Sequence, residues 1–108
     1  MIEKMAITNS LLTTGAAANV YVSSGSSAIT AMYLCNIDST ARTFSIFVCP
    51  SGMSVTQANT RIYSDIQIQS GDTYVVDSEK LILASGDMIK ANTSGASAIA
   101  MTVSFIGI

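Results

Sequence analysis

The sequence predicts an all-β protein, a single antiparallel β-sandwich of jelly-roll-like form with eight or nine short strands. Three observations carry this prediction. Apolar and polar residues alternate along short segments, as they do in strands that bury one face. Gly, Ser, Asn and Asp separate these segments at spacings of about 8–12 residues, which is typical of a sandwich or barrel. The tripeptide Ser-Gly-Asp also occurs twice, at 70–72 and 85–87.

The first half of the chain is expected to begin with residues 1–12 as an N-terminal arm or a first strand, followed by the sandwich domain at 13–108. Three strands are predicted there, at 19–22, 28–37 and 43–49. Small and polar residues around Gly15 and at 23–27 separate them. Pro50 ends the last of them, because proline cannot donate a hydrogen bond to a central strand.

The second half is expected to hold five strands, at 61–69, 73–77, 81–84, 88–92 and 98–108. In the first of these, Ile62, Ile66 and Ile68 are predicted to share one face. In the closing strand the residues expected to share one face are Ile99, Met101, Val103 and Phe105. No helix longer than about two turns is expected anywhere in the chain.

The two Ser-Gly-Asp turns are predicted to be structural. Gly71 and Gly86 would supply the positive φ of a tight turn, which other residues adopt at a cost. Asp72 and Asp87 would then cap the turn through their side chains. The alternative interpretation is a calcium site, because loop carboxylates suit that ion. Without a run of alternating Asp residues, turn capping is favoured.

The two cysteines, Cys35 and Cys49, are predicted to be reduced. The segment 38–42 is expected to join their strands as a hairpin in which Asp38 faces Arg42. In that register the two thiols do not lie opposite each other, which disfavours a disulfide. Small buried thiols of this kind fit assembly in a reducing cytoplasm.

The composition predicts self-association. Hydrophobic residues make up 49% of the chain and charged residues only 11%, against about 25% in an average protein. The strand at 43–49 is apolar on both faces. If Phe44, Ile46 and Val48 face the core, Phe47 and Cys49 point the other way and become candidates for an oligomer interface. We expect a homo-oligomer and favour a trimer.

The N-terminal dozen residues are predicted to make contacts outside their own domain. Their apolar residues, among them Ile2, Met5 and Ile7, follow no strict period, unlike those of the later strands. This irregularity fits an arm laid on a neighbouring chain. An edge strand is the alternative, and Ile2, Met5 and Ile7 are added to the candidate interface.

Little in the chain suggests catalysis. It has no His, and therefore lacks the usual general base and the commonest metal ligand. We expect no enzyme activity, no catalytic residues, no cofactor and no metal site. The five basic residues are scattered, so no nucleic-acid surface is expected. No apolar run is long enough for a membrane helix, and the N-terminus lacks the features of a signal peptide.

Several segments carry a resemblance to a known class of proteins. They are Val20-Tyr21-Val22, Ala28-Ile29-Thr30, Leu34-Cys35-Asn36, Phe44 to Val48, Ile62 to Ile66, Gly71, Leu81-Ile82-Leu83 and Gly86 to Ile89. Over most of its length the chain resembles small bacteriophage structural proteins with a β-sandwich fold. Members of that class serve as head decoration or cement proteins, fibres and tail attachments.

The resemblance implies a non-enzymatic structural component of a bacteriophage particle. A capsid decoration or cement protein is the first expectation, bound to the major capsid protein through apolar sheet faces and strand or arm contacts. It would be located in the virion and assembled in the host cytoplasm. The alternatives are a tail, collar or fibre-base component, or a carbohydrate-binding module for host recognition. Sugar binding would need exposed aromatic rings, for which Tyr21, Tyr33, Tyr63 and Tyr74 are the candidates.

Overall fold

A computed structural model describes residues 4–52, 60–77 and 81–108 of the chain. Within these residues the chain forms nine strands, and the prediction of an all-β sandwich is confirmed. The strands are β1 (Lys4–Leu11), β2 (Ala18–Val22), β3 (Ser27–Asn36), β4 (Arg42–Cys49), β5 (Arg61–Ile68), β6 (Thr73–Val76), β7 (Leu81–Leu83), β8 (Met88–Thr93) and β9 (Ile99–Gly107).

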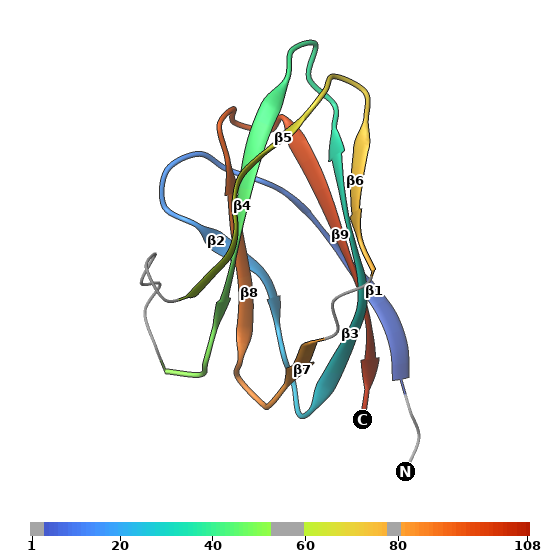
Figure 1. Cartoon of the computed structure of the whole chain (residues 1–108). Helices are drawn as coiled ribbons and strands as arrows, with labels where there is room; N and C mark the ends of the chain where they lie inside the picture. Colours follow the sequence, from blue (N-terminus) through green and yellow to red (C-terminus); the bar gives the residue numbers. More distant parts are fainter. Residues whose placement is uncertain (1–3, 53–59, 78–80) are drawn as a thin grey trace.

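The strands form two antiparallel sheets that pack face to face (Figure 1). Sheet A has the order β1-β9-β3-β6. β6 pairs with the C-terminal half of β3, and β7 pairs with the N-terminal part of the same edge of β3. Sheet B has the order β2-β8-β4-β5. Every strand pairing is antiparallel. Such sheets bury one face each and leave the other face outward.

The connectivity is that of a jelly roll. If β6 and β7 count as one broken strand, each sheet contains four strands. Only β4 and β5 are consecutive strands within sheet B, and the chain otherwise crosses between the sheets at nearly every connection. This alternation, with the last strand returning beside the first, is the double Greek key of jelly rolls. The expectation of a jelly-roll-like form is therefore confirmed.

The core lies between the two sheets and is almost wholly aliphatic and aromatic. Its largest fully buried members include Phe44, Leu34 and Ile46. In β9 the predicted alternation is confirmed, because Ile99, Met101 and Val103 are buried and Phe105 packs against them. In β4 the inward residues are Phe44, Ile46 and Val48, also as predicted.

The expected hairpin between the two cysteine-bearing strands is wrong. β3 lies in sheet A and β4 in sheet B, so Cys35 and Ser45 are not cross-strand neighbours. β3 pairs with β6, β7 and β9 instead, and Cys35 faces Thr73 and Ala100. The sequence of a short connection does not distinguish a hairpin from a crossing between two packed sheets, because the chain reverses its direction in both. Both thiols are free in the structure.

The expected alternation of β5 is also wrong at its N-terminal end. Ile66 and Ile68 face the core, but Ile62 is exposed and Tyr63 takes the inward position. The register against β4 shifts between these two parts of the strand. Asp65 sits at the shift with φ +49°, a left-handed conformation that bulges use. One extra residue at a bulge moves the following side chains to the other face.

Candidate functional site

The two Ser-Gly-Asp turns have the backbone that the sequence predicts. Gly71 has φ +81° and Gly86 has φ +87°. In each turn the Asp N–H donates to the carbonyl oxygen three residues earlier, at 3.0 Å, from Asp72 to Gln69 and from Asp87 to Ala84. A positive φ at the third position of such a turn is the type II geometry, which requires glycine there.

Each turn also holds one residue of a neighbouring segment by two backbone hydrogen bonds. Gly71 N–H donates to the Asn36 carbonyl and Asn36 N–H donates to the Asp72 carbonyl, both at 2.9 Å. In the second turn, Gly86 N–H donates to the Ser23 carbonyl at 2.8 Å, and Ser23 N–H donates to the Asp87 carbonyl at 2.9 Å. Because Asn36 lies at the end of β3 and Ser23 directly after β2, the turns close opposite ends of the sandwich.

The two Asp side chains differ. Asp87 accepts hydrogen bonds from two backbone N–H groups, those of Ser51 and Ala84, both at 2.9 Å. Among the described residues the Asp72 carboxylate accepts none, and its residue is exposed. The capping prediction therefore describes Asp87 better than Asp72. The two carboxylates lie at opposite ends of the sandwich and cannot share one calcium ion.

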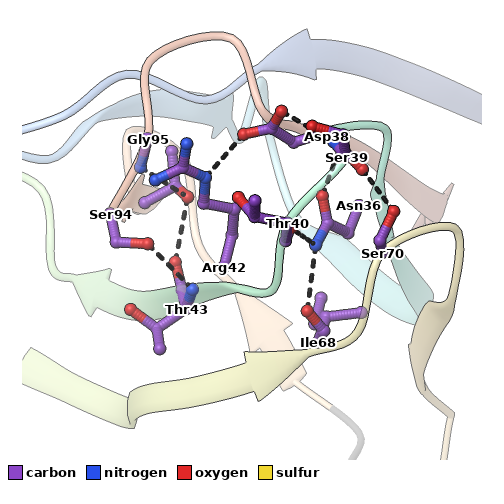
Figure 2. Close-up of polar contacts among 11 residues, drawn as sticks. Asn36, Asp38, Ser39, Thr40, Arg42, Thr43, Ile68, Ser70, Ser94 and Gly95 are labelled. Atoms are coloured by element: carbon purple, nitrogen blue, oxygen red, sulfur yellow. Dashed lines mark hydrogen bonds and ion pairs between the residues drawn. The ribbon is translucent and has the colours of Figure 1, made fainter.

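The end near Asn36 is tied together by that buried side chain (Figure 2). Its Nδ2 donates to the carbonyl oxygens of Thr40 and Ile68, both at 2.9 Å, and its Oδ1 accepts from the Asp38 N–H at 2.9 Å. Both donors and the acceptor of the amide are thus satisfied, which removes the cost of burying it. Asn36 joins both sheets at this end.

Asp38 and Arg42 form an ion pair beside Asn36 (Figure 2), but they do so within the connection between the two sheets and not as the cross-strand pair of the expected hairpin. Arg42 Nε lies 2.6 Å from Asp38 Oδ2. The hydrogen bond from Arg42, with a second from the Ser39 N–H, holds the pKa of Asp38 below its ordinary value. The pair is partly exposed, so it fixes the loop more than it stabilises the fold.

The described part of the chain holds no cluster of metal-ligating side chains. No group of three or more His, Cys, Asp or Glu side chains lies together there. No described helix is long and apolar enough to cross a membrane. The tyrosines do not form an exposed cluster either: Tyr63 and Tyr74 pack on Phe44, and Tyr21 packs on Phe105 with ring centroids 4.4 Å apart. Only Tyr33 of the four is exposed.

The side chains of sheet A that point away from the core make up what we call the open face. They follow from the strand register in four rows across the sheet. The rows are Leu11, Ala100, Cys35 and Thr73; Asn9, Thr102, Tyr33 and Val75; Ile7, Ser104 and Ala31; and Ile106, Ala28 and Ile82. None of these residues carries a charge at neutral pH.

The open face exposes large apolar side chains. Of the nine exposed large hydrophobic residues in the described chain, five lie on it: Ile82, Ile7, Leu11, Val75 and Tyr33. Four strand positions about 4.8 Å apart and eight residues at about 3.4 Å each give a face on the order of 500 Å². A face of this size is comparable with the largest patches that monomeric proteins expose, which are about 300–600 Å² and often functional.

The outward side of sheet B, which we call the closed face, is different. Phe47 and Cys49 point away from the core, as predicted, but both are fully buried within the chain. The guanidinium carbon of Arg61 lies 5.1 Å from the centre of the Phe47 ring, a cation–π distance. Lys90 is the neighbour of Phe47 on β8.

The residues predicted to form an interface are therefore distributed unevenly. Ile7 lies on the open face and is 64% exposed, whereas Phe47 and Cys49 offer no surface to another chain. Ile2 and the side chain of Met5 lie outside the described residues. Tyr33, Val75 and Ile82 were not predicted from the sequence to belong to an interface. The alternation of their strands marks them as outward, but only the strand order brings them together on one face.

Comparisons with known proteins give a fold and no family. No family model matches the chain, and no curated protein matches it. A chain from the capsid of Helicobacter pylori bacteriophage KHP30 is similar with a TM-score of 0.57 and 8% identity, covering 98% of this chain and 86% of that one. A chain from the Bacillus endospore appendages, described as disulfide-linked pili, is similar with a TM-score of 0.53 and 14% identity, covering 97% and 84%.

A third similar chain comes from infectious bursal disease virus, strain Gx. Its TM-score is 0.50 with 10% identity, and the match covers 99% of this chain but 33% of that one. At such low identity these likenesses establish the β-sandwich fold alone, because one fold serves many functions. All three chains come from assembled structures, two of them virus particles and one a pilus.

Proposed function

We propose that this chain is a non-enzymatic structural component of a bacteriophage particle and that it decorates the outer shell of the capsid. The open face carries the proposal. None of the residues in its four rows is charged, so its burial against another protein would desolvate no charge from these rows and would remove exposed hydrophobic side chains from water.

The size of the open face indicates what kind of contact it makes. About 500 Å² on each partner would bury roughly 1,000 Å² in total, the lower limit for a specific interface. Contacts from an edge strand or from the N-terminal residues would raise that area. We propose that the major capsid protein covers the open face and that the N-terminal segment adds a second contact.

The fold supports a structural role in a virus particle but does not distinguish capsid decoration from other such roles. The jelly-roll sandwich occurs in chains from a phage capsid and a second virus, and viral shells are a common use of this fold. A place in the virion, with assembly in the host cytoplasm, follows from the same reasoning. Self-association is part of the proposal, with the trimer as the favoured state.

The experiment is co-sedimentation of the purified chain with shells of its virus that lack it. The proposal expects the chain to pellet with the shells and to saturate at a fixed ratio to the capsid protein. Binding to isolated tails or fibres but not to shells would assign it to the tail, collar or fibre base. Filaments formed by the purified chain alone would favour a pilus-like subunit and would overturn the decoration role.

A further inference from the structure

The four edges of the two sheets are not equally protected. An edge strand exposes unpaired N–H and C=O groups, and proteins usually blunt such edges by short strands, bulges or charges. β2 is five residues long and its register shifts after Asn19. β5 shifts twice and carries Arg61 and Asp65. The far edge of sheet A is broken into β6 and β7, of four and three residues.

β1 is the exception. It spans eight residues and pairs with β9 in one unbroken register from Lys4 to Leu11. It has no proline and no charged residue after Lys4. Within the described chain it pairs with β9 alone, so its outer edge is long, regular and neutral.

The backbone groups that point to this edge can be identified from the hydrogen bonds. Leu12 N–H donates to the Ile99 carbonyl at 2.9 Å, which continues the register of Leu11 opposite Ala100. Hydrogen-bonded and non-bonded pairs alternate along antiparallel strands. Ser10, Thr8 and Ala6 therefore bond to β9, whereas Leu11, Asn9 and Ile7 direct their N–H and C=O groups away from it.

The other side of β9 gives an independent check. Ile37 N–H donates to the Ala98 carbonyl at 2.9 Å, so the even-numbered residues of β9 in this region bond to β3. Its odd-numbered residues, such as Ile99 and Met101, must then bond to β1. They face Leu12 and Ser10, which agrees with the assignment from Leu12.

We infer that a second copy of this chain adds its own β1 at this edge, antiparallel and related by a twofold axis through Asn9. In that register Asn9 faces its own counterpart and Ile7 faces Leu11 of the other copy, all through the free backbone groups. Apolar side chains then meet apolar ones on the open face. On the inner side Thr8 would face Ser10. A register centred on Thr8 would instead set Ile7 against Asn9, an apolar side chain against an amide.

The pairing would join two copies of sheet A into one continuous sheet. It would also double the width of the open face without covering it, so a contact with a shell or a threefold contact through another surface could coexist with it. The inference does not depend on the role in the particle, because it rests on the backbone groups of β1. Its test therefore uses the purified chain alone.

The first measurement is the mass of the chain in solution by sedimentation, for the wild type and for Ile7→Pro. Proline removes an N–H that points away from β9, so the fold should survive, but the added strand loses a hydrogen bond and meets the proline ring. We expect the wild type to contain this twofold contact, alone as a dimer or together with the threefold contact in a larger assembly, and we expect the contact to dissociate about tenfold more readily or worse in the variant. Ile7→Thr is the matched control, because it loses the same apolar side chain but keeps the N–H.

The second measurement is disulfide cross-linking in a Cys35→Ser background. Asn9→Cys should give a covalent dimer on mild oxidation, because the two residues face each other. Asn19→Cys, also exposed and on the edge strand β2, should not. A monomeric wild type, a dimer or trimer that Ile7→Pro leaves intact, or equal cross-linking at both positions would each overturn the inference.

Discussion

The two outer faces of the sandwich both carry apolar side chains, but these side chains are buried on one face and exposed to solvent on the other. On the closed face Phe47 and Cys49 are fully buried under the chain's own residues, with Arg61 against the Phe47 ring. On the open face Ile7, Val75 and Ile82 are exposed, and none of the residues in its four rows is charged, although Asp77 directly follows β6.

This difference shows that a strand with apolar residues on both faces can arise in two ways. Outward apolar residues that the chain covers itself contribute to its own stability. Outward apolar residues that it leaves exposed are available to a partner and contribute little to the isolated fold. A low content of charge alone does not tell these two cases apart.

The comparison first predicts a large difference in stability. Phe47→Ala should lower the free energy of unfolding by about 3–5 kcal/mol, because it leaves a cavity under the chain. Ile82→Thr on the open face should change it by about 0.5 kcal/mol or less, because the side chain already contacts water. Denaturant unfolding of both variants measures this. Similar losses would mean that the two faces do not differ as described.

The two Ser-Gly-Asp turns, which bond to Asn36 and Ser23 at opposite ends of the sandwich, should also differ in their sensitivity to substitution. An alanine at Gly71 meets only the cost of a positive φ, about 1–2 kcal/mol. An alanine at Gly86 has the same cost, and its Cβ would also lie 2.5 Å from Ser51 Oγ and 3.0 Å from Ser51 Cβ. We expect Gly86→Ala to lower the melting temperature more than Gly71→Ala.

The matched control for that pair is the double variant Gly86→Ala with Ser51→Gly. Removing the Ser51 side chain removes both close contacts but keeps the backbone N–H that binds Asp87. Its melting temperature should return to about that of Gly71→Ala. If Gly71→Ala is the more damaging single change, the account of the two turns is wrong.

The cysteines offer a chemical test of the same comparison. Cys35 lies half-buried on the open face and Cys49 is fully buried on the closed face. Alkylation of the native protein should therefore modify one thiol quickly, and unfolding should expose the second. In Cys35→Ser the fast reaction should be absent. Equal rates for the two thiols in the native state would contradict the burial of Cys49.

The smallest expected effect concerns pH. The pKa of Asp38 is lowered by the Arg42 hydrogen bond, so the stability that this pair adds is present above the ordinary value of 3.8 and is lost as the pH falls through the lowered pKa. Asp38→Asn should have a flatter loss of stability in acid than the wild type. The four rows of the open face do not include Asp38, so Asp38→Asn should leave binding through this face unchanged.

Much of the fold could be predicted from the sequence. Local alternation identified β9 and the inward residues of β4, and the turn residues Gly71 and Gly86 marked two reversals correctly. These features depend on neighbours in the chain. Which sheet a strand joins does not, and the crossing between β3 and β4 was mistaken for a hairpin for that reason. The bulge at Asp65, which exposes Ile62, likewise leaves no pattern in the residues around it.

The candidate site was the harder part. Phe47 was correctly placed outward, but nothing local reveals that the chain covers it. The open face depends on residues from β1, β3, β6, β7 and β9 meeting in register. Ile7 and Val75 are far apart in sequence and lie on one face only because of the strand order.

The central claim is that the open face is the surface on which the protein assembles. The direct measurement is co-sedimentation with shells that lack the chain, for Val75→Lys/Ile82→Lys on the open face and for Asn19→Lys/Gln67→Lys on the outward side of sheet B. Both pairs add the same charge at exposed positions and should leave the melting temperature nearly unchanged. We expect the first pair to abolish binding and the second to bind like the wild type. Wild-type binding by the open-face pair would contradict the account.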